Sequence, residues 1–318
     1  MYDFLDFQRQ LDRGKASPEM LADAIGGLWS LTSETDPLIT SLYARAKSGP
    51  VALAGLDLQL GSATSVYTKS AFSTELAAYL PEDRRKPCIA EIDRLTRWGY
   101  ETEQEATDAQ KPLREFAIDI QKGVGRGNAR GDATVAIMAE NLLRAVELST
   151  GDWYNNRDKA MYNNFVWYRS HQPDRNKIIV WCATVHAVKD LSFLVSERRT
   201  LGSQIHSLLK GKAATIGFSA LGGSYGRNPT SLTTLAPAPV DSLESQAFAG
   251  VKGDQVYLDG KQLKALGVIA AHPLQYTQWN STEWSNVVDG MLVFREEHPV
   301  HSVRSARPQQ LAAEVASP

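Results

Sequence analysis

The stretch from Arg157 to Asp190 constrains the fold of this chain more than any other. It opens with a predicted helix that Asp158 can cap and that ends before Pro173, because proline is excluded from a helix interior. A short apolar run, Ile178–Trp181, follows a polar break. Three of its four residues are β-branched, which predicts a strand covered on both faces, as in a parallel sheet.

His186 lies just beyond the carboxyl end of this predicted strand. Open α/β sheets bind ligands at that edge, and an imidazole there can serve as an acid or a hydrogen-bond donor. Among residues at ligand spacing from His186 only Asp190 carries a suitable group, which is too little for a metal site. The sequence therefore predicts His186 as a catalytic residue, with no metal and no cofactor.

Three charged residues are the other catalytic candidates. Arg157 can orient a carboxylate, or it can pair with Asp158 or with Asp57. Asp57 ends a second apolar run, Val51–Asp57, which predicts another buried strand closed by a carboxylate. Its alternative role is that of a helix cap or a loop residue.

The remaining periodicity predicts an α/β fold, with three α/β/α layers, a mostly parallel sheet and a helical lobe. Apolar residues recur at helical spacing before residue 48 and between residues 70 and 149, where 81–87 is a predicted solvated link. Further helices are predicted at 191–211 and from 241, and further strands at 214–218, 256–260 and 287–294, with a turn at 289–290. The predicted organisation assigns residues 1–63 and 151–302 to the α/β core, 64–150 to the lobe and 303–318 to a tail.

Composition narrows the class of protein. The chain has 318 residues, 43% of them hydrophobic, and a net charge of −2, which supports a large core and disfavours a nucleic-acid surface. Two cysteines, Cys88 and Cys182, make neither a disulfide framework nor a metal cluster. The amino terminus lacks the pattern of a signal peptide, and no apolar run reaches about 18 residues. We expect a cytoplasmic protein with a small-molecule partner and no membrane partner.

Two glycine-rich motifs invite functional readings. Residues 123–131 follow a predicted helix and lack a Gly-Lys-Ser/Thr ending, so an inter-helix loop is favoured over a phosphate loop. Gly222–Gly226 matches G-x-S-x-G, with Ser224 as the candidate nucleophile, but that motif needs a helix directly after the serine. A strand-end turn near the pocket is favoured, and a serine hydrolase that a fluorophosphonate probe would label is a third possibility. Tyr225 and Arg227 beside it, together with Trp181, are candidate substrate-binding residues.

Several short motifs follow one another along the chain in a characteristic order. The first reads R-D-x-x-M-x-x-N-x-x-W, and the strand that follows it ends in Trp181 and His186. The pattern includes Arg157, Asp158, Met161, Asn164 and Trp167, and continues at 29–32, 55–57, 201–202, 215–218, 222–226, 288–292 and Pro299. By their order and spacing these motifs resemble the erythromycin esterase family, which includes macrolide-inactivating lactone hydrolases.

The resemblance implies a hydrolase that cleaves a carboxylic ester or a macrolide lactone by activating water. Two departures from the pattern bear on this activity. The family's amino-terminal G-E-x-x-H-G element is absent, since the chain has no His-Gly dipeptide, and Ala183 replaces the first histidine of the strand-end pair. The alternative is a catalytically lapsed member that binds a small molecule or a partner.

The same resemblance implies that the acid- and base-bearing loops precede Met1, in a truncated or naturally shortened family member. Loss of a central strand would expose unpaired backbone groups, so we expect that edge to be covered or to pair with another chain as a homo-oligomer.

A buried tryptophan in the predicted strand gives a direct test. Replacement of Trp181 by alanine is expected to cost about 3–5 kcal/mol of unfolding free energy, as for other large-to-small changes in a core. Urea denaturation of the variant measures this loss.

Overall fold

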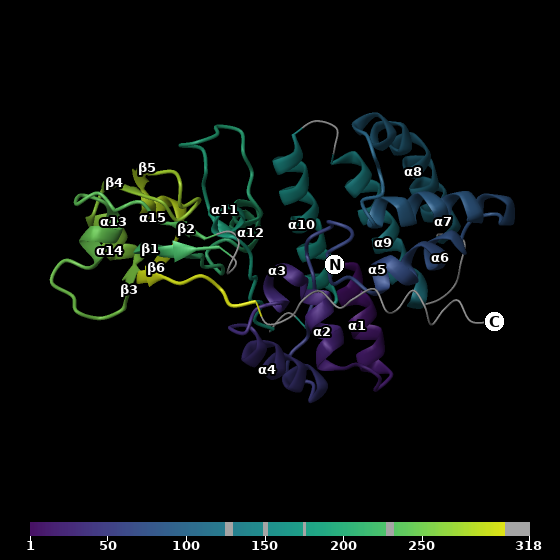
Figure 1. Ribbon diagram of the computed structural model, residues 1–318, viewed down its shortest axis with the longest axis horizontal. Helices are drawn as coiled ribbons and strands as arrows, with labels where there is room; N and C mark the ends of the chain where they lie inside the picture. The colour runs from purple at the N-terminus through teal and green to yellow at the C-terminus, as the bar shows by residue number, and fades with distance from the viewer. Residues whose placement is uncertain (125–129, 149–151, 174–175, 227–231, 303–318) are drawn as a thin grey trace. The chain divides into compact units, whose positions relative to one another are not determined.

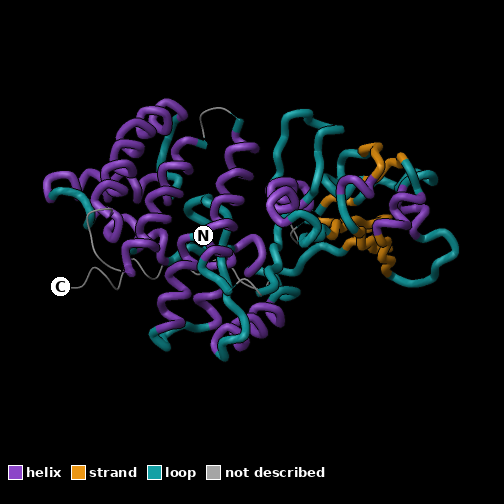
Figure 2. Tube along the Cα trace, turned by 180° about the vertical axis from the view of Figure 1, so that it is seen from behind, coloured by secondary structure: helices purple, strands orange, loops and turns teal. Residues whose placement is uncertain are grey.

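The computed structural model describes residues 1–124, 130–148, 152–173, 176–226 and 232–302 (Figure 1). It is a mixed α/β structure in which helices predominate. The chain divides into two compact units, one formed by Met1–Ala160 with Ser302 and the other by Met161–His301. All strands of the described residues belong to the second unit, where Figure 2 shows them in orange.

Helices and the loops between them make up the described part of the first unit. Its helices are α1 (Tyr2–Asp12), α2 (Pro18–Ile25), α3 (Gly27–Ser30), α4 (Asp36–Lys47), α5 (Tyr67–Ser70), α6 (Phe72–Ala77), α7 (Glu82–Thr96), α8 (Glu103–Val124) and α9 (Arg130–Glu147); α10 (Trp153–Ser170) contains the boundary between the units. The start of α2 is fixed by sequence, because Ser17 accepts a hydrogen bond from the Met20 N–H and Pro18 occupies the first helical position. Phe7 of α1, Leu21 of α2 and Ile39 of α4 share one apolar core.

The helices α8 and α9 lie side by side in the first unit (Figure 1). The apolar side chains that predict α8 are buried along one stripe, among them Leu113, Phe116 and Ile120. The helical spacing predicted between residues 70 and 149 is confirmed by α8 and α9 in its second half. This stripe, rather than helix propensity, stabilises the pair, since isolated helices of this length are marginal in water.

The second unit contains a sheet of order β2-β1-β6-β3 and a separate ribbon of β4 and β5. The strands are β1 (Ile216–Tyr225), β2 (Thr233–Thr234), β3 (Gln255–Asp259), β4 (Val268–Ala271), β5 (Asn280–Glu283) and β6 (Gly290–Glu297). The long strands β1 and β6 are parallel, and Ile216 pairs with Gly290. The pairs β1–β2, β3–β6 and β4–β5 are antiparallel, so the sheet is only partly parallel.

Short helices complete the second unit: α11 (Thr184–Ala187), α12 (Leu201–Leu209), α13 (Leu243–Ala247), α14 (Gly260–Ala265) and α15 (Trp284–Val287). Met291 and Val293 of β6 are buried in one core cluster with residues of α13, α14 and α15. Trp284 is the largest fully buried side chain of this cluster, and its indole N–H donates to the Ile269 carbonyl at 3.0 Å. That bond satisfies the one polar group of the ring.

The prediction of a strand at Ile178–Trp181 is wrong. In the described residues this segment joins no ladder, and Ile179 and Trp181 are 92% and 54% exposed. The predicted strand at Val51–Asp57 likewise has no ladder partner in the described part. A β-branched run favours extended backbone, but only a neighbouring strand makes it part of a sheet, and composition does not supply that neighbour.

The capping role predicted for Asp158 is also wrong. The helix α10 begins at Trp153, so Asp158 lies in its interior, where it is fully buried. The predicted end of this helix before Pro173 is confirmed, since α10 stops at Ser170.

Most of the other element predictions are confirmed, with shifted ends. Strands occur at β1, β3 and β6, and α13 begins where a helix was predicted. The predicted link at 81–87 instead starts α7, which accommodates Pro87 inside the helix. The predicted helix at 191–211 shortens to α12, and Asp289–Gly290 leads into β6 instead of turning it. The centre of the 123–131 loop and the tail at 303–318 lie outside the described residues.

Within the described residues, no helix combines the length and the apolar run that crossing a bilayer requires.

The two tryptophans give a matched test of this fold. Trp284→Ala should lower the unfolding free energy by about 3–5 kcal/mol, because it empties a fully buried position. Trp181→Ala, in the exposed segment, should now cost about 1 kcal/mol or less. Urea denaturation of both variants distinguishes the cases, and equal losses would contradict the observed burial.

Candidate functional site

His186 lies in α11, the short helical turn that follows the extended segment. Its backbone N–H donates to the Ala183 carbonyl at 2.9 Å, and its side chain is 8% exposed. The next residue but one, Val188, is fully buried in the core of the second unit. The imidazole is therefore at the margin of a packed region.

Four residues anchor the chain next to this turn, and we call them the Asp289 cluster: Lys189, His206, Thr215 and Asp289. The Lys189 Nζ donates to Asp289 Oδ1 at 2.7 Å and to the Ser285 carbonyl at 3.0 Å. The Thr215 N–H donates to Asp289 Oδ2, also at 2.7 Å. Because Thr215 and Asp289 directly precede the parallel strands β1 and β6, the cluster fixes Lys189 to the amino ends of both strands.

A second chain of hydrogen bonds reaches the turn itself. The Thr215 hydroxyl donates to the Ala187 carbonyl at 3.0 Å, and the His206 Nε2 lies 3.0 Å from the same hydroxyl. Since the hydroxyl proton is engaged with Ala187, His206 acts as the donor from Nε2. Through Thr215 these contacts fix Ala187, the residue next to His186, to the start of β1.

The charges of the cluster favour the folded state above acidic pH. Burial by itself would raise the pKa of Asp289, but the Lys189 ammonium and the Thr215 N–H outweigh it and hold that pKa below its usual value. Burial lowers the pKa of His206, with Lys189 adding to the effect and Asp289 opposing it. Neutral His206 is thus favoured in the fold.

The helix α12 packs against the turn through Gly202. Thr200 caps α12 by accepting from the Ser203 N–H at 2.9 Å, and its hydroxyl donates to the Val188 carbonyl at 2.5 Å. A Cβ atom at Gly202 would lie 1.8 Å from the Ala187 carbonyl oxygen. Only glycine allows this close approach between α12 and the end of α11.

The other charged candidates lie in the first unit. Arg157 forms a forked pair with Asp57, with Nε to Oδ1 at 3.3 Å and Nη2 to Oδ2 at 2.5 Å. Its Nη2 also donates to Gln59 Oε1 at 3.1 Å, and its guanidinium lies 5.0 Å from the centroid of the Trp153 ring. The structure thus brings Arg157 and Asp57 together, while His186, Trp181 and Tyr225 belong to the second unit.

The residues near the G-x-S-x-G motif lie at the carboxyl end of β1. Ser224 pairs with Thr234 within the sheet, so it does not occupy the sharp strand-to-helix turn of a nucleophile elbow. The Tyr225 ring lies 5.3 Å from that of Tyr276, whose hydroxyl donates to Glu297 at 3.0 Å. Arg227 lies outside the described residues.

Sequence reasoning missed a buried acid–imidazole pair in the second unit. Glu244 Oε1 accepts from the Ser219 hydroxyl at 2.6 Å and from the backbone N–H of His272 at 3.1 Å. The His272 Nε2 lies 3.8 Å from the same Glu244 oxygen and 2.8 Å from the Ala220 carbonyl oxygen. Glu244 and His272 are almost completely buried. No local pattern marks two single residues 28 positions apart, and their bonds connect α13, β1 and the end of β4.

These features define an α/β protein whose histidine-bearing turn is fixed to two parallel strands. The chain matches the erythromycin esterase family model over residues 9–297, and it belongs to that family. No curated protein sequence matches it.

Two solved structures share the fold. One is described as a succinoglycan biosynthesis protein, with a TM-score of 0.65 and 15% identity over 94% of this chain and 78% of that one. The other is a Bacillus cereus protein, with a TM-score of 0.65 and 17% identity over 95% of this chain and 80% of that one.

The close approach at Gly202 predicts a large effect of one methyl group. Gly202→Ala should lower the unfolding free energy by about 1–3 kcal/mol or more, because the added carbon overlaps the Ala187 carbonyl. Gly253→Ala is the matched control, since its nearest neighbour would lie 3.7 Å away. Chemical denaturation should separate the two, and a tolerated Gly202→Ala would refute the contact.

The lowered pKa of His206 predicts a pH dependence of stability. The unfolded chain takes up a proton near pH 6.5 while the folded chain resists it, so the unfolding free energy should fall as pH drops below about 6.5. His206→Gln should reduce this slope between about pH 7 and pH 5. Urea titrations at a series of pH values measure it, and an unchanged slope would count against the assignment.

Proposed function

We propose that this protein is an erythromycin-esterase-like hydrolase that cleaves a carboxylic ester or a macrolide lactone by activating water. The observation that supports the proposal most is the anchoring of the His186 turn. Family membership spans residues 9–297, and within that span the turn next to His186 is held by the Asp289 cluster. The fixed backbone on either side of the following residue limits where the imidazole can reach, and acid or donor catalysis requires a positioned group.

Each candidate residue has a role in this proposal. His186 donates a hydrogen bond or a proton to the oxygen that becomes negative when water attacks the carbonyl carbon. Arg157 orients the Asp57 carboxylate through their forked pair. Asp158, the next residue on α10, is the remaining catalytic candidate. Trp181, Tyr225 and Arg227 contact the substrate, for which the exposed Trp181 ring offers apolar surface.

The proposal includes the finer features expected for such a hydrolase. These are a three-layer α/β/α arrangement, an α/β core of residues 1–63 and 151–302 with a helical lobe at 64–150, a cytoplasmic location and a homo-oligomeric assembly.

The alternative function is binding without catalysis. It is favoured by the low exposure of His186, at 8%, since a catalytic imidazole has to reach its substrate. A family member of this kind would hold a small molecule or a partner and leave it unchanged.

Replacement of His186 separates the two functions. His186→Gln keeps a polar side chain but removes the titrating group, so turnover of a p-nitrophenyl ester or of a macrolide lactone should fall at least about 100-fold. His298→Gln, at an exposed position, is the matched control and should keep full activity.

The outcome is judged on folded protein, with thermal melting recorded for each variant. Retained turnover in His186→Gln would remove His186 from the mechanism. Absence of turnover in the unaltered chain, together with saturable binding of the intact lactone in calorimetry, would replace the hydrolase by the binding function.

A further inference from the structure

Cleavage of an ester by water requires a base as well as a hydrogen-bond donor. The base takes a proton from the attacking water, so it needs a free lone pair near neutral pH. The proposed hydrolase uses His186 as the donor, while Arg157 and Asp57 pair with each other in the first unit. A base that acts together with His186 has to lie close to it.

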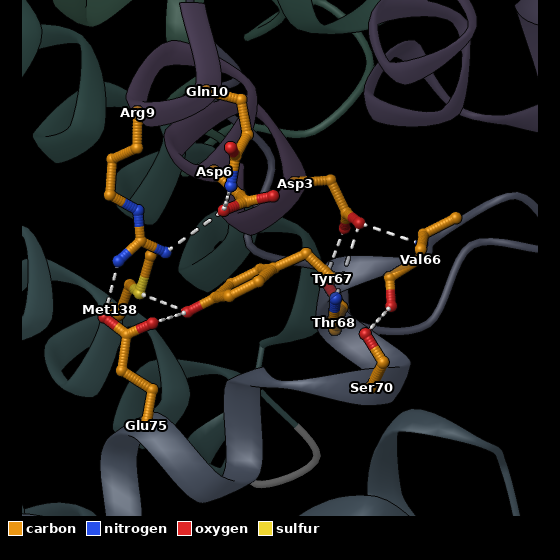
Figure 3. A network of polar contacts seen from close by, with 10 residues as sticks. All are labelled: Asp3, Asp6, Arg9, Gln10, Val66, Tyr67, Thr68, Ser70, Glu75 and Met138. Carbon is orange, nitrogen blue, oxygen red and sulfur yellow. Dashed lines mark hydrogen bonds and ion pairs between the residues drawn. The ribbon is translucent and has the colours of Figure 1, made fainter. Parts of the chain in front are cut away.

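The polar network between α1, α5 and α6 in the first unit is an example of acids that serve packing (Figure 3). Glu75 Oε1 lies 2.6 Å from Arg9 Nη1, and Glu75 Oε2 accepts from the Tyr67 hydroxyl at 2.7 Å. Asp3 accepts from the backbone N–H and from the hydroxyl of Thr68. Both carboxylates are thus engaged in holding the three helices together, and they belong to the other unit from His186.

His206 carries a lone pair whose position is fixed by its neighbours. It lies on α12, one helical turn after Gly202. The Thr215 hydroxyl gives its proton to the Ala187 carbonyl, so the Nε2–H of His206 donates to that hydroxyl at 3.0 Å. In a neutral imidazole the other nitrogen is then an acceptor. The free lone pair of His206 is therefore on Nδ1.

This nitrogen is open to water. Among the described residues, none donates a hydrogen bond to His206 Nδ1, and Nδ1 is not one of the sealed polar atoms that lack a partner. The side chain of His206 is 18% exposed, so solvent reaches the ring. A water molecule can therefore occupy the acceptor position of Nδ1.

Asp289 favours the charge that the His206 ring acquires when it acts as a base. Asp289 Oδ2 lies 3.6 Å from His206 Nε2. Burial alone would raise the pKa of Asp289, but the Lys189 ammonium and the Thr215 N–H hold it below its usual value, so this carboxylate is ionised. A negative group on the far side of the ring stabilises the imidazolium, as in other acid–histidine pairs.

The uncharged form of His206 is the one present before the reaction. Burial lowers the pKa of His206, while Asp289 opposes this effect and Lys189 adds to it. The ring is thus neutral at pH 7 and ready to accept a proton. Since the hydrogen bonds from Nε2 through Thr215 end on Ala187, the base and the proposed donor His186 belong to one local structure.

We propose that His206 is the general base of the hydrolysis and that Asp289 stabilises its protonated form. The inference rests on the proposed hydrolase function. His206 Nδ1 takes a proton from water while the water oxygen forms a bond to the ester carbonyl carbon, whose own oxygen becomes negative. When the ester carbon–oxygen bond breaks, the alkoxide leaves with that proton, and His206 is neutral again.

His206→Gln separates base catalysis from the structural role of the ring. The glutamine amide can still donate to Thr215, but it has no basic lone pair. With p-nitrophenyl acetate as substrate, kcat should fall at least about 100-fold. KM should change less than about three-fold, because the base acts in the chemical step.

The pH profile gives a readout that a structural role would not change. Neutral His206 is the active form, so kcat/KM of the unaltered chain should fall as the pH drops through the folded pKa of His206, which lies below the usual 6.5. His206→Gln should lose this acid limb. His298→Gln, at an exposed position of the same unit, is the matched control and should keep both the rate and the limb.

Diethyl pyrocarbonate, which acylates an unprotonated imidazole nitrogen, tests the base without any substitution. Turnover by the unaltered chain should be lost in step with modification of His206, measured by peptide mass. An unmodified His206 in folded chains whose exposed His298 has reacted would overturn the proposal.

The outcomes distinguish the base from the hydrolase function itself. Retained kcat in folded His206→Gln, or an acid limb that persists in this variant, would overturn the role of His206 and leave the hydrolase standing. Absence of turnover in the unaltered chain would instead remove the hydrolase function, and the base with it.

Discussion

The ion pair between Lys189 and Asp289 is the interaction on which the organisation of the second unit depends. Its two residues are 100 positions apart, and their contact at 2.7 Å joins the chain after the His186 turn to the start of β6. The same carboxylate accepts the N–H of Thr215, which precedes β1. One side chain thus fixes both parallel strands and the segment that follows the candidate catalytic histidine. Because the pair is only partly buried, its desolvation cost is moderate, and the Lys189 ammonium and the Thr215 N–H compensate the carboxylate charge.

The position of His186 is set from its carboxyl side. Val188 is buried, Lys189 is paired, and Gly202 lets α12 approach the Ala187 carbonyl. On the amino side, the apolar segment before the turn is exposed and belongs to no sheet in the described residues. This asymmetry explains how one imidazole can be well placed although the strand expected to deliver it is absent. The anchoring residues Lys189, Thr215 and Asp289 thus orient the turn without forming part of the proposed catalytic group.

Much of the fold follows from local sequence signals. Helical periodicity predicted α8, α9 and α12, and apolar runs predicted β1, β3 and β6, because their patterns match the burial of one face. The runs at Val51–Asp57 and Ile178–Trp181 carry the same signal yet form no ladder, since strand formation depends on a partner elsewhere in the chain.

The candidate functional residues show the same limit, because their contacts also depend on partners elsewhere in the chain. Arg157 and Asp57 were predicted as one possible pair from their charges, but the choice between Asp57 and Asp158 required the folded chain. Asp289 belongs to a predicted turn, and the Glu244–His272 pair carries no motif, because both contacts assemble from residues distant in sequence. The most direct test of the account is a double-mutant cycle on Lys189→Met and Asp289→Asn, measured by urea denaturation. The account predicts a coupling free energy of about 1–2 kcal/mol between the two residues, and additive losses with no coupling would contradict it.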